Sequence, residues 1–203
     1  MIYIGSFIET KGIRVLLEAI KRCPYHIVFH FAGKGRLEDS IRKMADSHKN
    51  ICLHGFLKEE ELNKLLSQMD ILVCPSVWAE PFGRVIIDGY KACVPAIVSD
   101  IGGMPELVED GITGLIVTPG SPDDLAQAII AESKKKMTVK RIDAIWNKLQ
   151  HFSITKQGDK FMEIYKKFGG YFTIANQYPF SQNLRYNAGF VRRPDIGQEM
   201  KAA

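Results

Sequence analysis

Short apolar runs that alternate with helical patterns constrain the fold of this chain more than any other feature. Between successive runs, apolar residues recur at helical spacing, as at Ile13, Leu16 and Ile20. Continuous apolar strands separated by helices predict a parallel sheet with helices on both faces. We therefore expect an α/β fold with a doubly wound parallel sheet, whose strands lie in MIYIG, HIVFHFAG, NICLHGF, DILVCPS, PAIVS and TGLIV.

The alternation predicts one domain over residues 1–133 of the 203 in the chain, a length sufficient to bury a core. Its last helix is expected to begin after Ser121, with a proline at the first helical position. Residues 134–170 are predicted to form basic helices that pack on this domain, the final one ending at Phe168 before two glycines. The periodicity is lost in residues 171–203, which we interpret as an irregular extension.

Charge is divided unevenly between the two parts of the chain. Residues 1–133 hold 13 Lys and Arg against 18 Asp and Glu, whereas residues 134–203 hold 14 against 5. The basic part is interpreted either as solvated helix faces or as a peripheral contact with an anionic membrane or a phosphorylated carrier. We expect no nucleic-acid partner. The opening residues reach Glu9 too soon for a secretory signal, which predicts a cytoplasmic protein, with membrane association as the alternative.

Neither the cysteines nor the histidines are spaced for metal binding. Cys52 and Cys74 lie in apolar segments that are expected to be neighbouring strands. His26 and His30 are predicted on one strand face, with backbones about 13 Å apart, which is too far for one metal ion. We therefore expect no metal and interpret all the cysteines as buried, reduced thiols, namely Cys23, Cys52, Cys74 and Cys93.

The loop CPSVWAEPFGRVIID is the most informative candidate for a binding site, because ligands of open parallel sheets bind beyond the carboxyl ends of the strands. A helix is expected to start at Gly83. The backbone N–H groups of Gly83, Arg84 and Val85 would then be unpaired at the positive end of a helix dipole, which suits a diphosphate. Arg84 either adds a cation or is an ordinary exposed side chain.

Two acids bracket this helix start. Glu80 and Asp88 would be separated by about 12 Å if the whole interval were helical. This exceeds the roughly 5 to 10 Å between the two carboxyl groups of a glycosidase. Two carboxylates placed along a nucleotide sugar fit the spacing better, one on sugar hydroxyls and one on ribose. The alternative is that Glu80 caps the helix and Asp88 is a surface acid.

Three other glycine-containing loops are weaker candidates, because none holds a complete phosphate-binding motif. Their glycines are interpreted either as turns or as places where the backbone approaches a ligand. Lys11 is either a phosphate contact or an ordinary lysine before a helix. The loops contain Gly5, Ser6 and Lys11; Gly33, Lys34 and Gly35; and Gly102 and Gly103.

Taken in chain order, these loops resemble the C-terminal, donor-binding half of the group 1, family-four-like retaining glycosyltransferases. The resemblance covers residues 1–133 and extends plausibly through the last helices. It implies a GT-B enzyme, in which two Rossmann-like halves close on a nucleotide sugar without any cofactor. The segments are GSFIETKGIRVLLEAI, FAGKGRLEDSI, HGFLKEEELNKLLSQMDILVCPS, EPFGRVIID, VPAIVSDIGGMPELVEDGITGLIV and PDDLAQAI.

The resemblance also implies roles for individual residues. Lys11 matches a lysine that contacts the diphosphate, and Glu80 matches the first acid of the family motif, near the transferred sugar; both are predicted to be catalytic. Asp88 matches the second acid, on ribose. The other predicted donor-binding residues are Gly5, Ser6, Gly33, Gly35, Phe82, Gly83, Arg84 and Val85.

Three departures from the family pattern stand out. Ser6 occupies the position of an arginine beside the leaving diphosphate. Asp88 replaces the usual glutamate and is one methylene shorter, and Cys93 stands where glycine is usual. These differences are expected to make the site divergent.

The predicted function is transfer of a sugar from a UDP or GDP sugar to a saccharide or lipid-linked acceptor, with retention of configuration. The resemblance implies that an N-terminal half, in the same or a separate chain, supplies part of the active site. We therefore expect this chain alone to be inactive. The alternatives are a nucleotide-sugar-binding pseudoenzyme or regulatory subunit, and an epimerase acting on the sugar of the donor.

Overall fold

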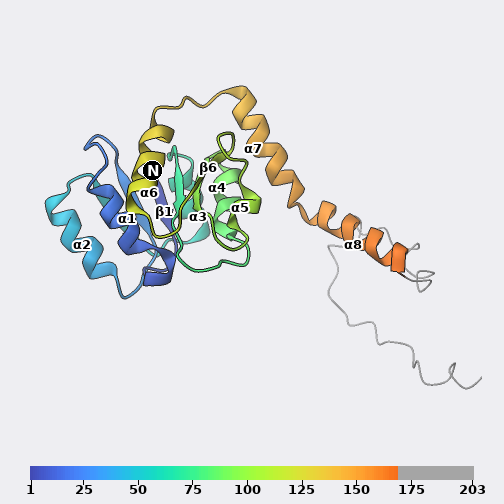
Figure 1. Cartoon of the computed structure of the whole chain (residues 1–203), viewed down its shortest axis with the longest axis horizontal. Helices are drawn as coiled ribbons and strands as arrows, with labels where there is room; N and C mark the ends of the chain where they lie inside the picture. The colour runs from blue at the N-terminus through green and yellow to red at the C-terminus, as the bar shows by residue number, and fades with distance from the viewer. Residues whose placement is uncertain (169–203) are drawn as a thin grey trace, which may run out of the picture. The chain divides into compact units, whose positions relative to one another are not determined.

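A single parallel sheet organises the larger part of the chain. The computed structural model describes residues 1–168, and the chain divides into two compact units, Met1–His151 and Phe152–Ala203. In the first unit, six parallel strands take the order β3-β2-β1-β4-β5-β6. Figure 1 labels the central strand β1 and the edge strand β6 among the helices. The strands are β1 (Ile2–Ile4), β2 (Phe29–Ala32), β3 (Ile51–Gly55), β4 (Leu72–Cys74), β5 (Ala96–Ser99) and β6 (Gly114–Val117).

The six strands arise from the six apolar runs, so the predicted α/β fold is confirmed. β1 lies in the centre of the sheet, where Ile2 is in register with His30 of β2 on one side and with Leu72 of β4 on the other. This strand order is that of a Rossmann-like sheet. The central strands are covered on both faces, which is why they read as continuous apolar runs rather than alternating ones.

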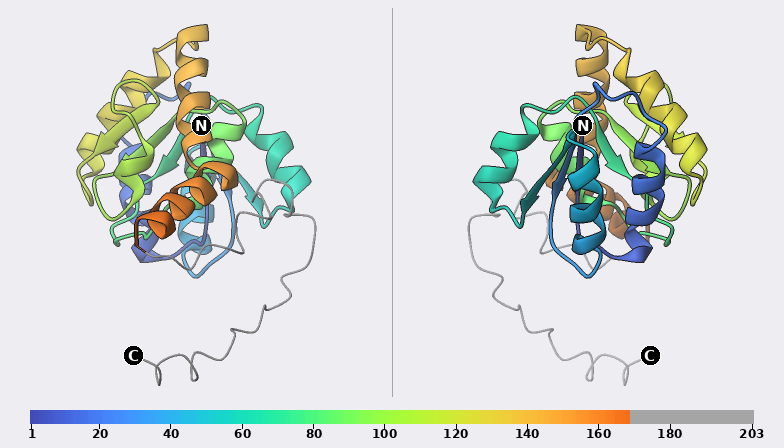
Figure 2. Two further views of the ribbon diagram at one scale, coloured as in Figure 1. Left: turned by 90° about the vertical axis from the view of Figure 1, so that its right-hand side faces the viewer. Right: turned by 90° about the vertical axis from the view of Figure 1, so that its left-hand side faces the viewer.

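Helices form a layer on each face of the sheet (Figure 2). α1 (Ile13–Ile20), α2 (Glu38–Ser47) and α6 (Pro122–Ser133) contribute to the main core with Tyr3, Phe29 and Phe31. As predicted, Ser121 caps α6, its hydroxyl accepting a hydrogen bond from the Asp124 N–H. The remaining elements of this unit are the 3₁₀ turn η1 (Glu9–Lys11), α3 (Glu59–Leu66), α4 (Arg84–Lys91), α5 (Met104–Leu107) and α7 (Val139–His151).

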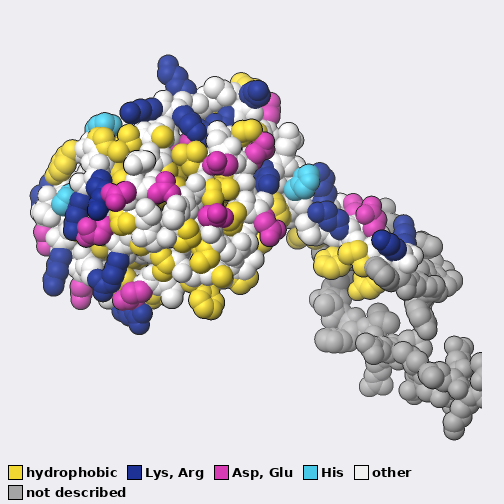
Figure 3. All heavy atoms as spheres, viewed as in Figure 1, with side chains coloured by type: hydrophobic (Ala, Val, Ile, Leu, Met, Phe, Trp, Pro, Cys, Tyr) yellow, Lys and Arg dark blue, Asp and Glu magenta, His cyan; other side chains and the backbone are white. Residues whose placement is uncertain are grey.

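The basic helices divide between the two units. α7 belongs to the first unit, where Ile145 is fully buried and Arg141 forms an ion pair with Glu132 of α6. α8 (Ile154–Phe168) belongs to the second unit and exposes apolar side chains such as Ile154 and Phe161. In this segment, hydrophobic side chains gather on one side (Figure 3). In the described part of the chain, no helix has the length and apolarity required to cross a membrane.

Three expectations about the cysteines and histidines are wrong. Cys52 lies in β3 and Cys74 in β4, which are separated by β2 and β1 rather than adjacent. All four cysteines are free, but of these only Cys74 is fully buried. β2 begins at Phe29, so His26 lies in the preceding turn and does not share a strand face with His30. The predicted irregular extension, residues 171–203, lies outside the described residues.

Candidate functional site

The candidate site lies where the order of the strands reverses, between β1 and β4. In a doubly wound sheet, the loops after these two strands diverge to opposite faces and leave a crevice at the carboxyl edge. A cavity of about 280 Å³ occupies this position. The residues that line it come mainly from those two loops and from the start of α4: Tyr3, Ile4, Gly5, Ser6, Lys11, Cys74, Ser76, Glu80, Gly83, Arg84, Val85 and Met104.

Glu80 is the acidic residue that lines this cavity. Its side chain is only 13% exposed, and Oε1 accepts hydrogen bonds from Lys11 Nζ at 2.5 Å and from Ser76 Oγ at 3.1 Å. The alternative in which Glu80 caps the helix is wrong, because α4 has no side-chain cap at its N-terminus. The structure therefore brings together Lys11 and Glu80, the two residues predicted to be catalytic.

The start of α4 presents backbone donors to the same cavity. Gly83 is the N-cap residue and has a left-handed conformation with φ of 89°, which favours glycine. Within residues 1–168, no backbone carbonyl pairs with the N–H groups of Gly83, Arg84 or Val85. These N–H groups form the positive end of the helix dipole, so the arrangement is suited to an anion.

The loop that carries Glu80 is held in place by a second loop packed against its backbone. Gly103 N–H donates to the Glu80 carbonyl at 2.7 Å. A Cβ atom on Gly102 would lie 2.4 Å from the same carbonyl oxygen, so only glycine allows this approach. Gly102 and Gly103 were interpreted either as a tight turn or as a place where the backbone approaches a ligand. The structure supports the tight turn, and the backbone of this turn contacts the loop that carries Glu80.

A second cavity, of about 350 Å³, adjoins the first. The two share Ile4, Gly5 and Ser6, and Gly33 lines the second one. Its outer wall includes Phe56, which is 71% exposed at the end of β3. Sequence reasoning missed this wall, although an aromatic residue at the end of the predicted strand NICLHGF was a usable signal. The other lining residues are Ala32, Lys34, Leu57 and Leu62.

Three predicted donor-binding residues do not line either cavity. Gly35 packs so closely on Phe7 that a Cβ atom would lie 2.5 Å from the Phe7 carbonyl oxygen. The Asp88 carboxylate forms an ion pair with Lys91 at 3.0 Å on α4. Phe82 is 42% exposed beside the start of α4. Their predicted contacts with the donor remain predictions.

The buried groups behind Glu80 are held in their neutral forms. Burial raises the pKa of the Cys74 thiol to about 12, and the nearby Glu80 carboxylate acts in the same direction. Burial, followed by Cys74 and Glu80, also raises the pKa of Tyr3 well above its usual range. Tyr3 Oη donates to the Ser6 carbonyl at 2.9 Å. Cys74 is therefore a packed thiol and not a nucleophile, and Tyr3 supports the first loop.

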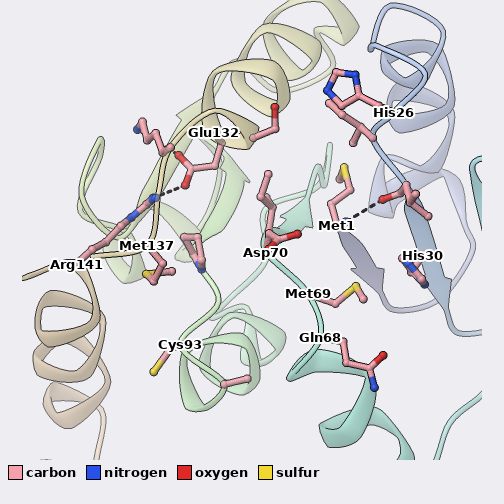
Figure 4. Close-up of a pocket in the computed structure, with 17 residues that line it drawn as sticks. Met1, His26, His30, Gln68, Met69, Asp70, Cys93, Glu132, Met137 and Arg141 are labelled. Carbon is pink, nitrogen blue, oxygen red and sulfur yellow. Dashed lines mark hydrogen bonds and ion pairs between the residues drawn. The ribbon is translucent and has the colours of Figure 1, made fainter. Parts of the chain in front are cut away.

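A larger cavity, of about 590 Å³, lies at the opposite, amino edge of the sheet. Figure 4 shows Asp70, Glu132 and Arg141 around it, with Arg141 reaching from α7 toward Glu132. None of the predicted site residues lines this cavity. We therefore assign the candidate site to the smaller cavities at the carboxyl edge. Residues 1–168 contain no cluster of three His, Cys, Asp or Glu side chains that could hold a metal ion.

Comparison with known proteins identifies the family to which the chain belongs. The family described as Glycosyl transferases group 1 matches residues 1–144. The chain therefore belongs to the group 1 glycosyltransferases, and it has the fold of the C-terminal domain of GT-B enzymes.

Named relatives include both curated sequences and solved structures. The chain is 33% identical over 183 residues to an alpha-maltose-1-phosphate synthase of Mycobacterium tuberculosis, covering 82% of this chain and 47% of that protein. It is 32% identical over 135 residues to an uncharacterised glycosyltransferase of Methanocaldococcus jannaschii, covering 64% and 34%. The Anabaena protein HepE, solved in complex with UDP, superposes with a TM-score of 0.70 at 24% identity, covering 82% and 48%. The chain thus spans between a third and a half of these relatives.

Proposed function

We propose that this chain is the donor-binding domain of a glycosyltransferase that transfers a sugar from a UDP or GDP sugar. The observation that carries the proposal is that Lys11, Glu80 and the unpaired N–H groups at the start of α4 line a single cavity at the reversal of strand order. The anion site suits the charged diphosphate of a sugar nucleotide, and the adjacent Glu80 carboxylate suits the hydroxyl groups of its sugar.

Each part of the donor has a place in this arrangement. The diphosphate binds at the N-terminus of α4, where Lys11 and Arg84 add positive charge, and Glu80 orients the sugar. The base occupies the second cavity beside Phe56. Stabilisation of the departing diphosphate is then the main catalytic contribution. For Asp88 to bind ribose, its carboxylate must turn from Lys91 toward the donor. Retention of configuration is proposed from the resemblance to retaining enzymes.

The acceptor is proposed to bind to a second Rossmann-like half, in the same or a separate chain. This is supported by the fraction of the relatives that the chain spans, between a third and a half. The acceptor is proposed to be a saccharide or a lipid-linked molecule. The expected inactivity of the present chain alone follows from the same proposal.

The basic helices are proposed to make a peripheral membrane contact. α8 combines exposed apolar side chains with lysines such as Lys160 and Lys167, a composition suited to an anionic interface. Sedimentation with vesicles containing anionic lipid tests this contact. We expect binding that weakens with salt and is lost on deletion of residues 152–203, which leaves α7 and the rest of the first unit in place. Binding that survives the deletion contradicts the contact.

Calorimetric titration with UDP and GDP sugars tests donor binding directly. The wild-type chain is expected to bind one sugar nucleotide more tightly than the corresponding diphosphate. Glu80→Ala should remove this preference, because the sugar then has no Glu80 carboxylate to bind. The matched control is Glu60→Ala, a change on the exposed side of α3. A folded wild-type chain that binds none of these ligands contradicts the proposal.

A nucleotide-sugar-binding pseudoenzyme is the second candidate, and Ser6 is the observation that favours it. Ser6 lines both cavities at the position where the family has an arginine, so one cation is missing beside the leaving group. Addition of a matching N-terminal half distinguishes the candidates. Donor binding without transfer supports the pseudoenzyme, and transfer to an acceptor excludes it.

A further inference from the structure

The two carboxylate oxygens of Glu80 have different surroundings. Oε1 accepts from both Lys11 and Ser76, whereas no hydrogen bond within residues 1–168 reaches Oε2. The Glu80 side chain lines the cavity and is 13% exposed. One oxygen is therefore held by the protein, and the other is left for a ligand.

The two donors to Oε1 are held with different rigidity. Ser76 is only 4% exposed and lies two residues after the end of β4, so its short side chain has little freedom to move. The Lys11 side chain is 33% exposed, and its ammonium group lies at the tip of a long, flexible stem. Lys11 can turn to an anion bound at the start of α4, whereas the short, buried side chain of Ser76 keeps its hydroxyl close to Glu80.

We propose that Ser76 is a positioning residue that holds Oε1 of Glu80, so that Oε2 faces the transferred sugar after Lys11 has moved to the diphosphate. This inference rests on the proposed function. A donor that draws Lys11 away leaves Ser76 as the remaining protein donor to the carboxylate. Ser76 then affects recognition of the sugar without affecting recognition of the nucleoside diphosphate.

Titration of wild type, Ser76→Ala and Ser76→Thr with UDP, UDP-glucose, GDP and GDP-mannose tests this division. For the base that wild type prefers, Ser76→Ala should reduce the affinity ratio of sugar nucleotide to diphosphate by about tenfold, the scale of one hydrogen bond to a charged group. Diphosphate affinity should be unchanged, and Ser76→Thr should restore the ratio. The matched control is Ser99→Ala, which removes a buried hydroxyl at the end of β5.

The outcomes separate this inference from the proposed function. Wild-type protein that binds no nucleotide overturns both. Wild-type protein that prefers the sugar nucleotide, together with a Ser76→Ala variant that keeps the full preference, overturns the inference alone. A crystal structure of Ser76→Ala with UDP gives a second test. We expect the Glu80 carboxylate to be rotated or to occupy several positions, and a carboxylate in its wild-type position also overturns the inference.

Discussion

Lys11 and Glu80 lie 69 positions apart in the sequence, yet Lys11 Nζ lies 2.5 Å from Glu80 Oε1. They meet because β1 and β4 are neighbours in the sheet and the loops after them share its carboxyl edge. The carboxylate compensates the charge of Lys11 while the site holds no anion. An anion that bound Lys11 would have to compete with this ion pair.

Lys11→Ala tests the contribution of this cation. We expect UDP to bind about tenfold more weakly, because one charge-assisted contact is lost. The affinity should also become less sensitive to salt, since fewer charges interact. Calorimetric titration at two salt concentrations measures both effects, with the exposed Lys43→Ala on α2 as control. An unchanged affinity for UDP would remove Lys11 from the proposed site.

Cys93 adopts a left-handed conformation, with φ of 58°, at the end of α4. Val94 N–H closes this end of the helix by donating to the Gly89 carbonyl at 2.9 Å. Glycine adopts this conformation without steric cost. Cys93→Gly should therefore raise the free energy of unfolding by about 0.5 to 1 kcal/mol, measured by urea denaturation. Cys93→Ala keeps the strain and should give no such gain; equal effects of both changes would exclude strain as the cause.

Arg141 attaches α7 to the first unit. It pairs with Glu132, whose side chain is 1% exposed, and its Nε donates to the Ile112 carbonyl at 2.8 Å. Arg141→Ala should lower the free energy of unfolding by about 3 kcal/mol, because a buried carboxylate loses its main partner. Denaturant unfolding measures this change. Arg42→Ala, which removes an exposed ion pair on α2, should cost less than about 1 kcal/mol. Equal costs would contradict a buried, stabilising pair.

His30 gives the first unit a pH dependence. Burial first, and then the positive N-terminus of Met1 and His54, lower the pKa of His30 below its usual value of 6.5. The unfolded chain then binds more protons than the folded chain as the pH falls through 6.5, so stability decreases toward acid. His30→Gln should lose less stability between pH 7.5 and 5 than wild type does, measured by denaturant unfolding. An identical pH profile would contradict this contribution.

The fold was predictable to the extent that it depends on local pattern. The six apolar runs predict the strands, and Ser121 predicts the start of α6, because burial and capping are recorded in neighbouring residues. The order of the strands is not recorded there, so Cys52 and Cys74 were wrongly placed side by side. The stacked pair of His30 and His54, with 2.9 Å between Nδ1 and Nε2, was missed for the same reason.

The site was predictable where a loop follows directly on a strand. Lys11, Glu80 and Gly83 were identified from their positions after predicted strands and from the family resemblance, and the structure places them in one cavity. The contact between Ser76 and Glu80 was not predicted, because it depends on how the loop folds back on itself. The wall formed by Phe56 depends on β3 lying beside β2, which a local pattern does not specify.

A crystal structure of the chain soaked with a UDP or GDP sugar tests the proposed site most directly. We expect the diphosphate to lie against the N–H groups of Gly83, Arg84 and Val85, with Lys11 turned toward it and Glu80 on the sugar. The assignment of this cavity would be contradicted if neighbouring side chains closed the start of α4 and the ligand lay elsewhere or was absent.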